Sequence, residues 1–252
     1  GLGANTSANV HTVSSRSDFS NALEALREEL PMAKGASLVV SWFGSDLRCG
    51  LCQPQPKVEQ NAQDGVPMPW VVSNTPRATA AVVPLVQGSP VYGGTPADAS
   101  VIEAIVALKA AGREVTFYPF LLMDQMAGNA LPDPWTGALG QPALPSRGRI
   151  TLSAAPGQPA SPDRSAAAAA EVAQFFGTAQ PSHFTQTGQS VLYSGPAEWS
   201  YRRFILHYAY LCRAAGGVDA FCVGSELRGL TSIRGANDSF PAVRRCGNWR
   251  AR

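Results

Sequence analysis

The sequence predicts an α/β fold in which helices alternate with the strands of a parallel sheet. Three times, a segment with helical spacing is followed at once by an apolar segment that resembles a buried strand. Each apolar segment ends in polar or acidic residues, as the strands of β/α barrels do at their catalytic rim. Such alternation is the pattern of right-handed crossover units around a parallel sheet.

The first unit covers residues 18–43. Asp18 is a candidate N-cap for a helix that Pro31 closes, and one face of that helix is apolar. The segment 36–43 follows and is almost continuously apolar, which predicts a strand buried on both faces. Asp46 lies just beyond its carboxyl end. A weaker strand pattern at residues 9–13 precedes the helix.

The second unit covers residues 95–124. Thr95, Pro96 and Asp98 form a strong helix start, and Gly112 is a helix stop. The apolar segment 114–124 then predicts a second buried strand, with its proline near the end rather than in mid-ladder. This segment finishes on a carboxylate, Asp124.

The third unit carries the most informative residue of the chain. A helix is predicted to begin near residues 195–198 and to end at the glycines 216 and 217. The apolar run from Val218 follows and leads to Glu226. An apolar strand that presents one carboxylate at its carboxyl end is the way a β/α barrel displays an acid catalyst. The plainer interpretation makes Glu226 a solvated loop residue or an ion-pair partner of Arg228.

Two long segments interrupt the alternation. Residues 125–198 hold nine of the twenty prolines, and only 163–176 shows helical character within them. Residues 53–92 are likewise irregular. Because both segments follow the carboxyl ends of strands, we expect both at the rim where a barrel would place its site.

Composition restricts the class of protein. The chain has 252 residues, 45% hydrophobic and 15% charged, with a formal net charge of +2, which does not suggest a nucleic-acid binder. Its apolar runs are too short to span a membrane, and no signal peptide is expected near Gly1. The five cysteines predict a reducing compartment at synthesis. Cys49 and Cys52 have metal-pair spacing without partner ligands, so we expect core thiols, no metal and no cofactor.

Several long stretches carry a family resemblance. They are SLVVSWFGSDLRCGLC, YGGTPADASVIEAI, TFYPFLLMD, GNALPDPW, EWSYRRFILHYAYLC and GGVDAFCVGSELRGLT. From about Val13 to Ala242 the chain resembles the TIM-barrel-like domain of gene transfer agent and phage tail proteins, which are hub or tip components of tail-like particles. More distantly, the strand ends resemble the second, third and fourth strands of retaining TIM-barrel glycoside hydrolases.

The resemblance to these hydrolases implies roles for particular residues. Glu226 takes the place of the general acid/base, and Ser225 stands where the hydrolases commonly carry the asparagine that contacts the sugar 2-hydroxyl. The hydrolase nucleophile comes from the seventh strand, and no residue of this chain corresponds to it. The candidate substrate-binding residues are Trp42, Asp46, Tyr118, Asp124, Ser225 and Arg228. We expect Glu226, Trp42 and Asp124 to share one cavity at the rim.

The resemblance also implies an architecture and a biological setting. It implies the N-terminal half of a TIM (β/α)8-like barrel over residues 1–243, with the insertion 125–198 after the third strand. Residues 244–252 are expected to be an aberrant, out-of-frame tail without a buried face.

Three functions remain open. The first is a fragment of a phage-tail-like hub or tip protein, made in the bacterial cytoplasm, whose partners are tail or baseplate proteins and host envelope polysaccharide. The second is a retaining glycoside hydrolase whose nucleophile is on a missing half. The third is a purely structural barrel.

Overall fold

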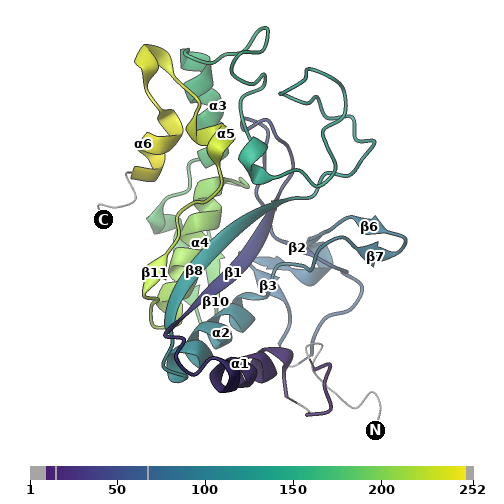
Figure 1. Ribbon diagram of the computed structural model, residues 1–252, viewed down its shortest axis with the longest axis vertical. Helices are drawn as coiled ribbons and strands as arrows, with labels where there is room; N and C mark the ends of the chain where they lie inside the picture. The colour runs from purple at the N-terminus through teal and green to yellow at the C-terminus, as the bar shows by residue number, and fades with distance from the viewer. Residues whose placement is uncertain (1–9, 15, 67, 248–252) are drawn as a thin grey trace.

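The computed structural model describes residues 10–14, 16–66 and 68–247. Its centre is a three-stranded parallel sheet in the order β1 (Gly35–Gly44), β8 (Glu114–Met123) and β11 (Ala220–Phe221). β1 and β8 pair along their whole length, whereas β11 pairs with β8 over two residues only (Figure 1). The predicted α/β class with a parallel sheet is confirmed, and the described residues do not close the sheet into a barrel.

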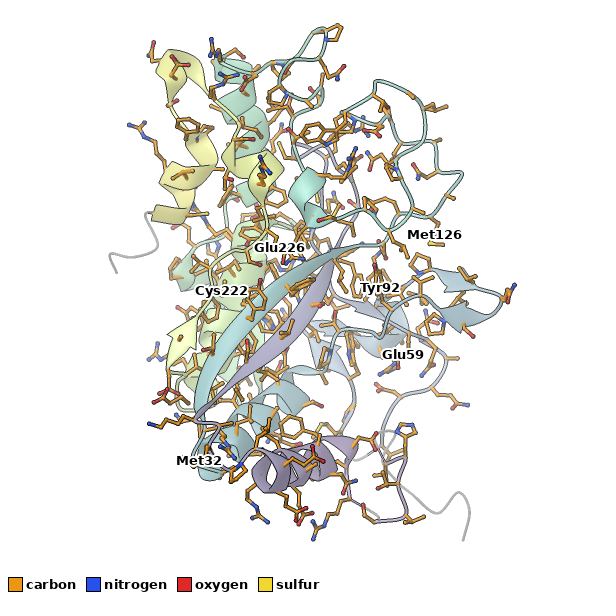
Figure 2. The ribbon with its side chains drawn as sticks, viewed as in Figure 1. Met32, Glu59, Tyr92, Met126, Cys222 and Glu226 are labelled. Atoms are coloured by element: carbon orange, nitrogen blue, oxygen red, sulfur yellow. The ribbon has the colours of Figure 1, made fainter. Side chains whose placement is uncertain are left out.

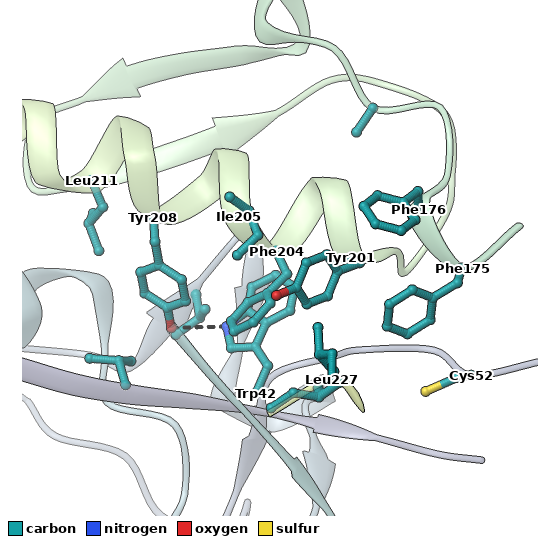
Figure 3. Packing of buried hydrophobic residues seen from close by; sticks show 14 of the residues in the cluster. Trp42, Cys52, Phe175, Phe176, Tyr201, Phe204, Ile205, Tyr208, Leu211 and Leu227 are labelled. Atoms are coloured by element: carbon teal, nitrogen blue, oxygen red, sulfur yellow. Dashed lines mark hydrogen bonds between the residues drawn. The ribbon is translucent and has the colours of Figure 1, made fainter. Parts of the chain in front are cut away.

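Two helices, α2 (Asp98–Ala110) and α4 (Tyr201–Ala214), pack on the same face of this sheet. Trp42 of β1 donates a hydrogen bond from its indole nitrogen to the Tyr208 hydroxyl of α4, at 2.9 Å (Figure 3). His207 of α4 pairs with Asp98 at the start of α2, at 2.8 Å between Nε2 and Oδ1. The two helices therefore form one layer behind the sheet.

The expectation that both strands are buried on both faces is wrong. Val115, Phe117 and Leu121 of β8 point to the helices and are buried, whereas the alternate residues Thr116 and Tyr118 are exposed and half-buried. β1 alternates in the same way over its first six residues. We call the side opposite the helices the open face, formed by Val39, Thr116, Tyr118 and Phe120. No α-helix of the described residues packs on it, and η2 (Arg147–Arg149) reaches only its Phe120 end.

Pro119 lies in the middle of β8 and pairs with Val40, not near the strand end as expected. The carbonyls of Val115 and Phe117 accept hydrogen bonds from Asp219 and Cys222 on the β11 side. Every second residue of a strand directs its backbone groups to the same side, so Pro119 faces the β11 side, as Val115 and Phe117 do. The β11 ladder has already ended there, and the missing N–H of Pro119 therefore costs no ladder hydrogen bond.

The first helix, α1 (Asp18–Glu29), begins one residue earlier than expected. Its N-cap is Ser17, whose hydroxyl accepts from the backbone N–H of Ser20, and Asp18 is the first helical residue. None of its side chains is buried. Residues 10–13 of the weakly predicted strand contain no strand, and residue 9 lies outside the described residues.

The insertion 125–198 is more ordered than the sequence indicated. The predicted helix is present as α3 (Ala166–Phe176), and an unpredicted hairpin follows, formed by β9 (Phe184–Thr187) and β10 (Ser190–Tyr193). Phe175 and Phe176 pack against Tyr201 of α4 (Figure 3). The insertion therefore contributes to the main core. Two 3-10 helices also lie in it, η2 (Arg147–Arg149) and η3 (Pro181–His183).

The segment 53–92 contains only short elements. Their bounds are β2 (Lys57–Val58), β3 (Val71–Val72), β4 (Thr75–Pro76), η1 (Arg77–Thr79), β5 (Ala81–Val82), β6 (Leu85–Val86) and β7 (Ser89–Pro90). They pair as β2 with β5, β3 with β4 and β6 with β7. The chain after β11 forms α5 (Arg228–Thr231), η4 (Ala236–Asp238) and α6 (Pro241–Gly247).

The expected tail from residue 244 is helical in its described part, where Arg245 and Cys246 are half-buried. Residues 244–247 continue α6, and Cys246 packs against the main core. Ala242 in the same helix is buried, and α6 contacts α3 and α5. Residues 248–252 lie outside the described residues.

Candidate functional site

The loop after β11 carries Glu226, which lies five residues beyond the strand end at Phe221 rather than on the strand itself. Hydrogen bonds from two elements fix this loop. The buried Tyr201 of α4 donates to the carbonyl of Val223 at 3.1 Å, and Tyr118 on the open face donates to the Ser225 hydroxyl. Tyr118, in the middle of β8, and Ser225, in the loop after β11, therefore lie side by side.

Arg147 is the central cation of the site, and sequence reasoning did not identify it. It lies in η2 of the insertion, 78 residues from Ser225, and only 6% of it is exposed. Its Nε donates to the Ser225 carbonyl at 3.1 Å, and its Nη2 donates to the Ser225 hydroxyl at 3.2 Å. Its guanidinium carbon lies 3.5 Å from the centre of the Phe120 ring, a cation–π distance.

Glu226 projects from the loop between β11 and α5 (Figure 2). Its side chain is 65% exposed, and its Oε2 lies 3.1 Å from Nη2 of Arg147. Its backbone is left-handed, with φ at 51°, which is uncommon for a residue with a side chain. Glu226 therefore forms an ion pair, as the plainer interpretation predicted, but its partner is Arg147 and not Arg228.

Close backbone contacts explain how the insertion reaches this loop. A Cβ on Gly229 would lie 2.6 Å from the Ile150 carbonyl and 2.7 Å from the Gly148 carbonyl. A Cβ on Gly148 would lie 3.1 Å from the Glu226 carbonyl. Two glycines thus let η2 approach both the Glu226 loop and α5, because a side chain at either position would push the segments apart.

A hollow of about 440 Å³ lies beside Glu226. Its walls come from the loop after β11, from α5 and from α6, and include Arg228, Val243 and Cys246. Arg228 is exposed, and no carboxylate of the described residues lies within 4 Å of it. The hollow therefore combines one carboxylate, one free guanidinium and an apolar wall.

The two other predicted acids lie in separate ion pairs. Asp124 is buried and accepts from Nζ of Lys57 at 2.6 Å. Asp46 accepts two bonds from the side chain of Arg48, at 3.0 and 2.6 Å, and one from Gln141 at 2.7 Å. Neither acid lines the hollow beside Glu226. The expected cavity shared by Glu226, Asp124 and Trp42 is therefore absent from the described residues.

Trp42 is a core residue and not the substrate-binding residue that the sequence predicted. It is fully buried and contacts Phe204 and Tyr208 of α4 (Figure 3). It also contacts His207 of the same helix. In β1 it shares the helix-facing side with Val40. A sugar ring cannot stack on it, because both faces of the indole are inside the protein.

The chemistry available at this rim is hydrogen bonding and charge recognition. Tyr118 and Ser225 supply hydroxyls, Glu226 supplies an acceptor, and Arg228 supplies donors. Retaining glycoside hydrolysis needs a second carboxylate about 5 to 5.5 Å from the acid/base. The hollow contains no second acid among its described lining residues. Within the described chain, no three His, Cys, Asp or Glu side chains gather as a metal site, and no helix is long and apolar enough to cross a membrane.

Comparison with known proteins supports the family resemblance over part of the chain. Residues 199–250 match the model of the gene transfer agent (GTA) TIM-barrel-like domain. A search of curated proteins gave no match. The matched range contains α4, β11, the Glu226 loop and α6. The predicted resemblance to the TIM-barrel-like domain of gene transfer agent proteins is therefore confirmed, and residues 199–250 carry it.

Proposed function

We propose that the chain is part of a tail-associated protein of a gene-transfer-agent or phage-like particle, and that its rim contacts a glycan of the host envelope. The observation that carries this proposal is the family match, which spans the loop presenting Ser225 and Glu226. Tail or baseplate proteins are the corresponding protein partners.

The proposed architecture is a segment of a barrel. β1, β8 and β11 are adjacent in the sheet in the same order as in the sequence, and α2 and α4 between them lie on one face. A doubly wound sheet places helices on both faces and reverses its strand order, whereas a barrel keeps all helices outside. On this basis the open face corresponds to the interior of a (β/α)8-like barrel.

Binding is favoured over hydrolysis for the described residues. Lys57 and Arg48 already hold Asp124 and Asp46, so neither acid is placed as a nucleophile opposite Glu226. Hydroxyl and carboxylate groups at a rim, beside a hollow, are suited to sugar hydroxyls. The proposed role is therefore attachment to a polysaccharide without cleavage.

The test measures binding of the chain to a panel of bacterial capsular and envelope polysaccharides. The double variant Tyr118→Phe with Ser225→Ala removes two rim hydroxyls and is expected to weaken binding about tenfold, because each lost hydrogen bond contributes about 0.5 to 1.5 kcal/mol. Glu103→Gln, on the exposed side of α2, is the matched control and is expected to bind normally.

Two further measurements separate the alternatives. A hydrolase would release reducing sugar from a bound polysaccharide, and Glu226→Gln would stop that release. A purely structural barrel would bind none of the polysaccharides. Absence of the chain from purified particles, probed with a specific antibody, would contradict the tail assignment.

A further inference from the structure

The hollow beside Glu226 is lined by one positive and one negative side chain, Arg228 and Glu226. Arg228 lines it, and Arg147 lies behind Glu226. Helix α6 supplies Val243 and Cys246 to the wall and carries two arginines between them in sequence. Glu226 is the one carboxylate among the described lining residues, and Arg147 already pairs with it.

The guanidinium of Arg147 is held in place by the protein rather than by solvent. The Phe120 ring stacks on it, and the backbone carbonyl of Ser225 accepts from its Nε. No described residue accepts a hydrogen bond from its Nη1. A buried, stacked guanidinium is pre-organised for a planar carboxylate, and the carboxylate that Arg147 holds is that of Glu226.

We propose that this hollow recognises the carboxylate of an acidic sugar residue, such as a uronic acid, with Arg228 as the specificity-determining residue. The inference rests on the proposed function, because it names the class of glycan that the rim contacts. Arg147 neutralises Glu226, which would otherwise repel a second carboxylate, and Arg228 is left free to pair with the ligand. The apolar wall at Val243 and Cys246 faces the carbon skeleton of the sugar ring.

The test compares two probes with the same backbone. Oligogalacturonic acid carries a carboxylate on each residue, and carboxyl reduction converts it to the neutral galactose oligomer. Calorimetric titration of the full chain is expected to show at least about tenfold tighter binding of the acidic probe, since hydrogen bonds to charged groups contribute about twice as much as neutral ones. Raising the ionic strength should weaken binding of the acidic probe and leave the neutral probe unaffected.

Two variants locate the effect. Arg228→Gln removes the free guanidinium and is expected to abolish the preference for the acidic probe. Arg213→Gln removes another exposed arginine, near the end of α4 and away from this hollow, and is expected to preserve the preference. Equal loss in both variants would show a general charge effect and overturn the assignment of Arg228.

The outcomes also separate this inference from the proposed function. Equal binding of the acidic and neutral probes, or binding of neither, overturns the acidic-sugar inference. If the chain still binds an envelope polysaccharide through Tyr118 and Ser225, the proposed function stands without it. If the chain binds no polysaccharide at all, both fail together.

Discussion

Replacement of Asp98 by alanine should destabilise the whole domain, because this carboxylate joins three elements. Asp98 is the first residue of α2 and is 1% exposed. Its Oδ1 pairs with Nε2 of the fully buried His207 at 2.8 Å, and its Oδ2 accepts from the Ser190 hydroxyl of β10 at 2.8 Å. Alanine would leave the His207 nitrogen without a partner in the core.

The magnitude follows from these two bonds. A hydrogen bond to a charged group contributes about 1.5 to 3 kcal/mol, and the Ser190 bond adds about 1 kcal/mol because half-buried Ser190 can turn toward water. The acid also lies at a helix N-terminus, which adds about 0.5 kcal/mol. The expected loss in the free energy of unfolding is therefore about 3 to 4.5 kcal/mol.

Urea unfolding followed by circular dichroism measures this loss. Glu103→Ala removes an exposed acid from the same helix and should change stability by less than about 0.5 kcal/mol. An Asp98→Ala variant that loses less than about 1 kcal/mol would refute the reasoning, because the buried pair would then contribute no more than a surface contact.

Three more predictions concern other parts of the molecule. Burial raises the pKa of the Cys52 and Cys212 thiols to about 12, and it raises the pKa of the Cys49 thiol further. A thiol reagent should therefore modify the partly exposed Cys222 first and should modify the three buried cysteines only on unfolding. Gly177→Ala should lower the free energy of unfolding by about 2 to 4 kcal/mol, measured by thermal or urea unfolding, because φ is +71° and the new Cβ would lie 2.3 Å from Cβ of Ser200. At Gly217 φ is +88° and the new Cβ would meet open space, so Gly217→Ala should lower it less. Burial raises the pKa of Glu198, but hydrogen bonds from Thr178, Ser200 and Ala179 outweigh it and leave the pKa below its usual value. The stability from this group is therefore present above about pH 4.3 and lost as the pH falls through the lowered pKa, so Glu198→Gln should flatten the acid limb of a stability–pH curve.

Local sequence signals predicted the helices well. The apolar spacing located α2, although its N-cap is Ala97 and not Thr95, so that Asp98 is its first residue. The same kind of spacing located α4, although its N-cap is Ser200 and not a residue near 195–198. The strands of the sheet were also located, because long apolar runs after a helix stop have few other interpretations. These signals come from residues that are close together in the sequence, and the helices and strands that they predict are present in the described structure.

The facing of strand residues could not be predicted in the same way. Trp42 and Phe43 are both apolar, so a period of two assigns neither to the helix side. The observed register places Trp42 beside Val40 on that side, and only the packing of α4 decides it.

The β9–β10 hairpin had a usable signal, because Gly188 begins a two-residue turn between the alternating residues of the two strands.

Arg147 had no usable signal at all. It lies in a proline-rich segment without periodicity, and its partner Ser225 is 78 residues away. Its role depends on a tertiary contact through Gly148 and Gly229, and a single sequence does not express such a contact. Through this same residue the insertion contacts the Glu226 loop, and its place on the site side of the sheet stays a prediction.

The left-handed backbone of Glu226 connects these observations. A residue with a side chain costs about 1 to 2 kcal/mol in this conformation, and glycine would avoid that cost. The loop is nevertheless held by bonds from Tyr201, Tyr118 and Arg147, each worth about 1 kcal/mol, which together offset the strain. A strained residue that three separate elements support, and whose carboxylate is still two-thirds exposed, is more consistent with ligand contact than with a structural role.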